Sequence, residues 1–185
     1  MSPCLKNLLE EAKQSQNLLA FSIHTQASRN DFFVGRVISY THEILTIEPI
    51  DKNGLTNGIE IFRIDGIYHV EIRSQYLERL DKINASQYYA VDKEIVNITS
   101  VVEALNFIFK KKILSTFHFG EDFELRGIIN LFDSDKFDNP MILLRSFDEY
   151  GKYDGESCFY IDNITSISFE GRSERYITSL ALELF

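Results

Sequence analysis

The chain has 185 residues, of which 44% are hydrophobic and 13% aromatic, and its formal net charge at pH 7 is -9. This composition excludes a disordered protein, and no apolar run approaches the roughly 20 residues of a membrane-spanning helix. The acidic balance argues against non-specific nucleic-acid binding, which depends on lysine and arginine neutralising phosphates. Residues 1–12 carry no basic, apolar leader, so the sequence predicts a cytoplasmic protein.

The first half begins with a predicted helix, residues 2–17, in which Ser2 is the N-cap and leucines recur at helical spacing. Five extended segments with alternating apolar and polar residues are predicted to follow: 18–25, 31–40, 43–50, 59–64 and 67–73. Gly35 inside the second segment predicts a bend or a close backbone approach. A short helix capped by Ser74 is predicted next, and then a linker with one short strand around residues 88–91.

The second half repeats this plan. Residues 64, 65, 67, 70 and 72 align at a constant offset of 97 with residues 161, 162, 164, 167 and 169. A helix is predicted after Ser100, which forms a capping box with Glu103. Strands are predicted at 114–119, 123–132, 141–147, 158–161 and 164–170, and a final helix at 173–184. The duplication predicts two modules, residues 1–90 and 91–185.

A helix followed by five short strands, one of them bent, resembles the Sm-like (LSm) barrel. The segment Phe-Arg-Ile-Asp-Gly-Ile, residues 62–67, is similar to the second Sm motif, in which a basic residue and a glycine precede the last strand. The resemblance, which extends to a bacterial type with the same Ile-Asp-x-Ile close, implies a mainly β (α+β) fold. It would contain two tandem, five-stranded Sm-like open barrels, each preceded by an α-helix.

The turn before each last strand holds the repeat-equivalent residues Asp65 and Gly66, and Asp162 and Asn163. We expect the two aspartates to hydrogen-bond the turn backbone, as aspartates commonly do in turns. The alternative is a catalytic carboxylate pair, which would require the two turns to converge. No nucleophile, phosphate-binding or dinucleotide motif occurs, so the sequence predicts no catalytic residue and no cofactor.

Other candidate ligands have simpler interpretations. Cys4 and Cys158 fit no metal-ligand spacing and are predicted to be buried, reduced thiols. The repeat-equivalent His24 and His118 are predicted to be half-exposed strand residues, with a ligand or partner contact as the alternative. The acidic segment with Asp133, Asp135 and Asp138 lacks the glycine and glutamate of a calcium loop and is predicted to be a solvated loop. No metal site is predicted.

Three consecutive lysines, residues 110–112, close the predicted helix of the second half. Cations at a helix C-terminus interact favourably with the helix dipole, and we favour this interpretation. The alternative is a patch that binds an anionic surface or nucleic acid.

These observations favour a non-catalytic module that binds a protein partner or assembles through exposed strand edges. Residues 91–185 hold ten Lys/Arg against seventeen Asp/Glu, which favours a basic partner. Neither DNA nor a membrane is predicted as a partner. The alternative is an RNA-binding protein with a local basic and aromatic patch: Arg63, Arg73, Arg79, Lys82, Tyr68 and Tyr76. A third hypothesis is a small-molecule or metal-dependent activity in a groove between the modules.

Overall fold

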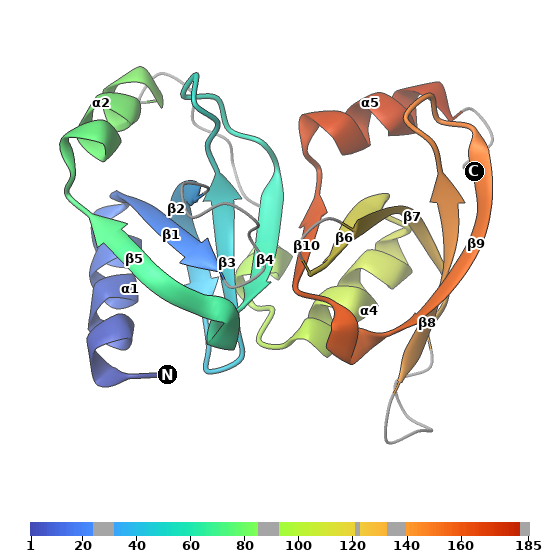
Figure 1. Ribbon diagram of the computed structural model, residues 1–185, viewed down its shortest axis with the longest axis horizontal. Helices are drawn as coiled ribbons and strands as arrows, with labels where there is room; N and C mark the ends of the chain where they lie inside the picture. Colours follow the sequence, from blue (N-terminus) through green and yellow to red (C-terminus); the bar gives the residue numbers. More distant parts are fainter. Residues whose placement is uncertain (24–31, 85–92, 121–122, 133–139, 182–185) are drawn as a thin grey trace.

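The structure of the protein is a computed structural model that describes residues 1–23, 32–84, 93–120, 123–132 and 140–181 (Figure 1). The elements of the first half are α1 (Pro3–Ser15), β1 (Leu18–Ile23), β2 (Phe33–Tyr40), β3 (Ile44–Pro49), β4 (Ile59–Arg63), η1 (Ile64–Gly66), β5 (Ile67–Ile72) and α2 (Gln75–Asn84). Those of the second half are α3 (Lys93–Val96), α4 (Val101–Lys111), β6 (Ser115–Phe119), β7 (Phe123–Phe132), β8 (Met141–Phe147), β9 (Tyr153–Tyr160), η2 (Ile161–Asn163), β10 (Ser166–Phe169) and α5 (Arg172–Leu180).

The described strands form one antiparallel sheet of ten strands, in the order β5-β1-β2-β3-β4-β10-β6-β7-β8-β9. The predicted mainly β fold is therefore confirmed. Each half contributes five strands in the same spatial order, since β10-β6-β7-β8-β9 repeats β5-β1-β2-β3-β4. Figure 1 shows the two halves side by side, with β4 and β10 adjacent at the centre. We call this pair of strands the seam.

The two halves also agree in their irregularities. The β2–β3 register shifts between Val37 and Ser39, and the β7–β8 register shifts between Ile129 and Leu131. Such bulges bend a strand and increase its twist, which fits the bent second strand predicted for each half. The mid-strand glycine next to each bulge lies against the neighbouring backbone, because an added Cβ at Gly35 would lie 2.6 Å from the Glu48 carbonyl oxygen.

The largest hydrophobic cluster contains residues from both halves. Ile44, Ile59 and Ile61 of the first half pack in the same buried cluster as α4 and the second-half strands. A second cluster, around Phe21 and Phe62, lies within the first half and includes residues of α1. Helix α4 of the second half is therefore packed in a core to which both halves contribute.

Several sequence predictions need correction. Cys4 and Cys158 are both exposed, because Cys4 lies in the first turn of α1 and Cys158 alternates along β9 with the buried Phe159 and so lies on the other face of the strand. Strand β9 starts at Tyr153, five residues before the predicted start, because it continues the hairpin with β8. The last helix begins at Arg172 and ends at Leu180, earlier than predicted. The strand predicted around residues 88–91 lies outside the described residues.

Thr46 on β3 provides a test of the packing in the first half. Its side chain is fully buried, and its hydroxyl has no hydrogen-bond partner among the described residues. A buried hydroxyl without a partner costs desolvation free energy, so we expect Thr46→Val to raise the free energy of unfolding by about 1 kcal/mol. Because the chain has no tryptophan, urea denaturation followed by far-UV circular dichroism is the suitable measurement.

The matched control is Thr116→Val on β6. The Thr116 hydroxyl donates to Glu174 Oε1 at 2.5 Å and accepts from Arg126 Nε at 3.2 Å. This substitution removes the shorter of the two hydrogen bonds to the buried Glu174 carboxylate, so it should lower the free energy of unfolding by about 1–3 kcal/mol. Equal destabilisation by the two substitutions would contradict the prediction for Thr46.

Candidate functional site

The seam joins the two halves by a regular strand pair. Ile59 lies opposite Phe169, and Ile61 lies opposite Ile167, and all four side chains are buried. Without this pair, β4 and β10 would both have an unpaired edge of backbone amides and carbonyls, which is a template for strand addition. The seam is thus an edge-to-edge contact between two copies of the repeat, closed by apolar side chains.

Arg63, at the end of β4, adds a polar contact to the seam. Its Nε donates to the Ile164 carbonyl oxygen at 2.8 Å, and its Nη2 donates to the Ile161 carbonyl oxygen at 3.1 Å. The same Nη2 lies 3.7 Å from Asp162 Oδ1. A guanidinium holds several donors in one plane, so a single side chain can bind both ends of the η2 turn. Arg63 was predicted to belong to an RNA patch, whereas its side chain binds the second half.

A pair of buried carboxylates lies beside the seam. Glu60 on β4 is 8% exposed and accepts a hydrogen bond of 3.4 Å from the Ser166 hydroxyl. Glu174 on α5 is 6% exposed and accepts from the hydroxyls of Thr116 at 2.5 Å and Ser168 at 3.3 Å. Strand β4 of the first half and β6, β10 and α5 of the second half therefore meet in one buried polar cluster. We call it the seam cluster; it consists of Glu60, Thr116, Ser166, Ser168 and Glu174.

Burial raises the pKa of Glu60 to about 8, because the charged carboxylate loses its hydration; the hydrogen bond from Ser166 opposes this change, and the nearby carboxylate of Glu174 adds to it. Glu60 is therefore mostly protonated at neutral pH. A neutral acid can remain in the seam without a cationic partner.

His118 lies next to this cluster on β6, opposite Ser166. Its side chain is 32% exposed, which fits the predicted half-exposed strand position, and its Nδ1 is 3.7 Å from Glu124 Oε2. Burial lowers the pKa of His118, although the carboxylates of Glu124 and Glu174 oppose this effect. Its repeat counterpart His24 lies outside the described residues.

The two ends of the sheet carry the strand edges that could take part in assembly. Within the described part of the chain, β5 pairs with β1 on one side alone, and β9 pairs with β8 on one side alone. By the repeat, β5 corresponds to β10 and β9 corresponds to β4, the two strands of the seam. The molecule therefore presents at its ends the same two kinds of edge that it joins at its centre.

The other residues of the predicted RNA patch lie on β5 or after it in the chain. Arg63 precedes β5 and Arg73 follows it, so the six-residue strand separates them by about 20 Å. Tyr68 lies on β5, whereas Tyr76, Arg79 and Lys82 lie on α2 and are exposed. The structure therefore brings the α2 residues together on one helix but does not bring Arg63 to them.

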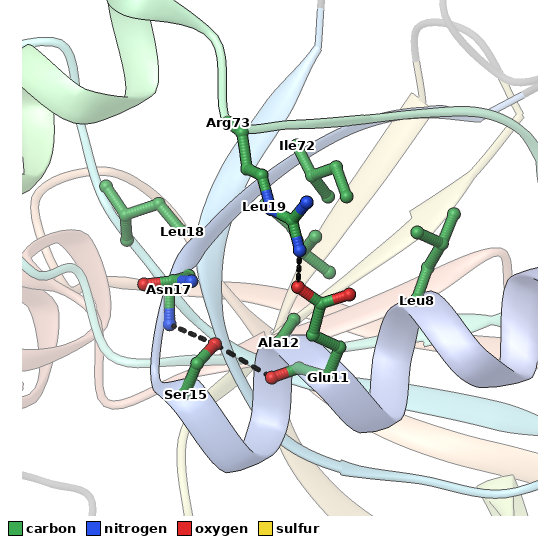
Figure 2. Close-up of a pocket in the computed structure, with 9 residues that line it drawn as sticks. All are labelled: Leu8, Glu11, Ala12, Ser15, Asn17, Leu18, Leu19, Ile72 and Arg73. Atoms are coloured by element: carbon green, nitrogen blue, oxygen red, sulfur yellow. Dashed lines mark hydrogen bonds and ion pairs between the residues drawn. The ribbon is translucent and has the colours of Figure 1, made fainter.

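Arg73 and Tyr76 make contacts of their own. Figure 2 shows Arg73 directed toward α1, where its Nη2 forms an ion pair with Glu11 Oε1. The cavity beside this pair has a volume of about 10 Å³, which is room for about one water molecule and not for a larger ligand. The Tyr76 ring packs edge-on against the Phe32 ring at a centroid distance of 5.8 Å.

The repeat-equivalent turn residues do not behave as predicted. In η1 and η2 the turn is closed by backbone, since the amides of Ile67 and Ile164 donate to the carbonyls of Ile64 and Ile161. Asp65 and Asp162 are both exposed, and within the described residues neither carboxylate accepts a hydrogen bond from the backbone of its turn. A 3-10 turn provides this bond by itself, so the predicted hydrogen bond from the carboxylate is not needed. Gly66 and Asn163 end the two turns.

No group of three or more His, Cys, Asp or Glu side chains suited to a metal ion occurs among the described residues. The segment with Asp133, Asp135 and Asp138 lies outside them. None of the described helices is long and apolar enough to span a membrane.

These observations define the class of molecule: a mainly β protein in which two sets of five strands with the same spatial order form one open antiparallel sheet. Comparisons of the chain with known protein families, with curated proteins and with solved structures give no match. The candidate site is therefore inferred from the geometry of the seam and of the two sheet edges.

Sequence reasoning missed the seam cluster. Glu60 and Glu174 are far apart in the chain, and no spacing rule connects a strand in one half to the last helix of the other. One signal was present: Glu60 stands alone among Ile59, Ile61 and Phe62 in an otherwise apolar segment. A carboxylate in a strand buried on both faces is a candidate for a raised pKa.

Proposed function

We propose that the protein is a non-catalytic assembly module whose partner is a second copy of the same chain. In this assembly, β9 of one copy pairs antiparallel with β5 of the next copy. The single observation that carries the proposal is the seam, in which the corresponding strands β4 and β10 already form this pair within one chain. Edge strands offer unpaired backbone groups, so a repeated edge contact is a direct use of such a sheet.

We infer that each set of five strands is a small, partly closed Sm-like barrel covered by its preceding helix. This inference is supported by the shared strand order, by the bulge at the same place in each half, and by a helix before the first strand of each half. Closure of a barrel requires strongly bent strands, and bulges provide such bends. Two barrels in one chain then leave one edge at each end for assembly.

The register of the proposed contact follows from the repeat. Applying the offset of 97 to the seam places Val70 opposite Cys158, where the seam has Ile167 opposite Ile61. It places Glu71 opposite Ser157, where the seam has Ser168 opposite Glu60. One apolar pair and one serine–glutamate pair are thus retained, with the serine and the glutamate exchanged between the strands.

The proposed contact differs from the seam in two ways that make it weaker. Tyr160 stands at the position of Arg63, so the guanidinium that binds the η2 turn has no counterpart. Glu156 would face Ile72, where the seam has Ile59 facing Phe169. We therefore expect association that depends on protein concentration. A head-to-tail contact closes into a ring or extends into a filament, according to the rotation between copies.

Disulfide trapping tests both the contact and its register. A Val70→Cys variant in a Cys4→Ser background should form disulfide-linked oligomers through native Cys158 under mild oxidation. Residues directly opposite in antiparallel strands have Cα atoms about 4.5–5.5 Å apart, which suits a disulfide. Light scattering on the unmodified protein should show a mass that rises with concentration.

Glu71→Cys in the same background is the matched control. A one-residue step turns the side chain to the other face of the sheet, so this cysteine should react with Cys158 much more slowly. A Val70→Cys, Cys158→Ser variant should form no ladder of linked chains. A monomer at every concentration, together with equal linkage at residues 70 and 71, would overturn the proposal.

A further inference from the structure

A basic cavity in the second half lies away from the seam, next to strand β9. It has a volume of about 490 Å³ and is lined by the end of α4 and by the middle of β7 and β8: Phe109, Lys110, Lys112, Ile128, Ile129, Asn130 and Arg145. This size falls within the range of small-molecule sites. We propose that the cavity binds a small organic anion that carries a phosphate group on an apolar body.

The cations of this cavity are not neutralised by the described part of the chain. Within that part, Lys110, Lys112 and Arg145 form no ion pair with a carboxylate, whereas Lys111, between the two lysines, pairs with Glu94 at 2.5 Å. Glu156 lies opposite Arg145 in the pairing of β8 with β9, but its carboxylate accepts from Asn130 Nδ2 at 3.2 Å. Three cations therefore face one carboxylate in a protein whose net charge is -9.

The first half shows that the fold does not require these charges. Gln16 occupies the same left-handed C-cap position in α1 that Lys112 occupies in α4, so Gln14 corresponds to Lys110. On the strands, the pair Ile128 and Arg145 corresponds to the pair Arg36 and Glu48, next to the equivalent glycines.

In the first half the arginine at this place is compensated. Arg36 lies opposite Glu48 and also pairs with Asp81 at 2.6 Å. In the second half the arginine is on the other strand, between Ile128 of β7 and Glu156 of β9, and among the described residues it forms no ion pair like that of Arg36 with Asp81. A helix-dipole role explains some basic residues at the end of α4, but it does not explain an arginine on β8 that forms no ion pair within the described part of the chain.

Arg145 is also held in a defined position. Its guanidinium lies 5.6 Å from the centroid of the Phe147 ring and 5.3 Å from that of the Tyr153 ring. Stacking between a guanidinium and aromatic rings fixes the plane in which its N–H groups point. A planar guanidinium with two lysines beside it matches the oxygens of a phosphate, and the isoleucine and phenylalanine side chains suit an apolar body.

Nucleotide titrations test this inference. The probes are adenosine 5′-monophosphate, adenosine and inorganic phosphate, each followed at low and moderate salt by amide chemical shifts in nuclear magnetic resonance. We expect the nucleotide to shift amides of α4, β7 and β8, to bind at least about tenfold more tightly than adenosine, and to weaken as salt rises. Arg145→Gln should weaken nucleotide binding by about tenfold or more, while Lys152→Gln, an exposed lysine of the same half, should leave it unchanged.

The outcomes are separable. If inorganic phosphate binds as tightly as the nucleotide, the apolar body contributes nothing to binding, and that part of the proposal is overturned. Equal binding of nucleotide and adenosine, or equal binding by the wild type and Arg145→Gln, would overturn it. The absence of any amide shift at low salt would also overturn the proposal. Binding of a short oligoadenylate RNA at this cavity, without binding of the free nucleotide, would overturn it as well. Urea denaturation of each variant shows whether the fold is retained.

Discussion

Gly127→Ala is expected to lower the free energy of unfolding by about 2–4 kcal/mol. The Cβ of an alanine at this position would lie 2.2 Å from the carbonyl oxygen of Arg145 and 2.9 Å from Leu144 Cγ. The first of these contacts is to backbone of the neighbouring strand, so β7 and β8 would have to separate next to the bulge. Urea denaturation followed by far-UV circular dichroism measures the loss.

The matched control is Gly66→Ala in the η1 turn, where an added Cβ meets no atom within 4 Å. We expect this variant to change the free energy of unfolding by less than about 0.5 kcal/mol. Gly35→Ala should resemble Gly127→Ala, because its Cβ would lie 2.6 Å from the Glu48 carbonyl oxygen. If Gly127→Ala and Gly66→Ala are equally stable, close strand approach is not the reason for glycine in the second strand of each half.

Glu60→Gln is expected to abolish a large pH dependence of stability. The pKa of Glu60 is about 8 in the folded protein, against 4.5 for an unperturbed glutamate. Between these values the unfolded chain releases a proton that the folded protein keeps. The contribution of Glu60 to the free energy of unfolding is thus fully present below pH 4.5 and is lost as pH rises through 8, with a total on the order of 5 kcal/mol.

The glutamine variant stays neutral, so it should match the wild type near pH 5 and be several kcal/mol more stable near pH 9. His118 acts in the opposite direction: its pKa is lowered, so its contribution is lost as pH falls through its folded pKa, below 6.5. The comparison is therefore most informative between about pH 6.5 and 9, where His118 titrates little. Glu78→Gln, an exposed glutamate on α2, is the control and should follow the wild type at every pH. Parallel curves for Glu60→Gln and the wild type would contradict a buried, protonated Glu60.

Local signals in the sequence predicted local structure well. The Ser100 hydroxyl accepts from the Glu103 amide at 3.1 Å, as the capping box predicts. The Glu103 carboxylate, however, accepts from the amide of Thr99 at 2.8 Å, one residue before the predicted partner. The glycines of the second strands were predicted to mark a bend or a close approach, and both features occur there. These predictions hold because a cap or a bulge depends on a few neighbouring residues.

The exposure of particular side chains was harder to predict. Cys158 lies in an alternating segment and was expected to be a buried thiol. On β9 it alternates with the buried Phe159, and β9 pairs on one side alone among the described residues, so the face that carries the thiol is exposed. Arg63 was assigned to the basic and aromatic patch, yet its guanidinium binds carbonyls about 100 positions away in the chain. Which strand becomes an edge depends on the order of the whole sheet.

The sequence by itself determined that the chain contains one structural plan twice, with a helix, five strands and a turn of Ile-Asp-Gly or Ile-Asp-Asn in each copy. Periodicity, capping residues and glycine positions are local, so each copy carries them independently of the other. The tertiary structure alone decided that β4 of one copy pairs with β10 of the other, and that Glu60 and Glu174 share a buried cluster. Edge pairing joins backbone groups that every residue possesses, so no side-chain pattern specifies which edges meet.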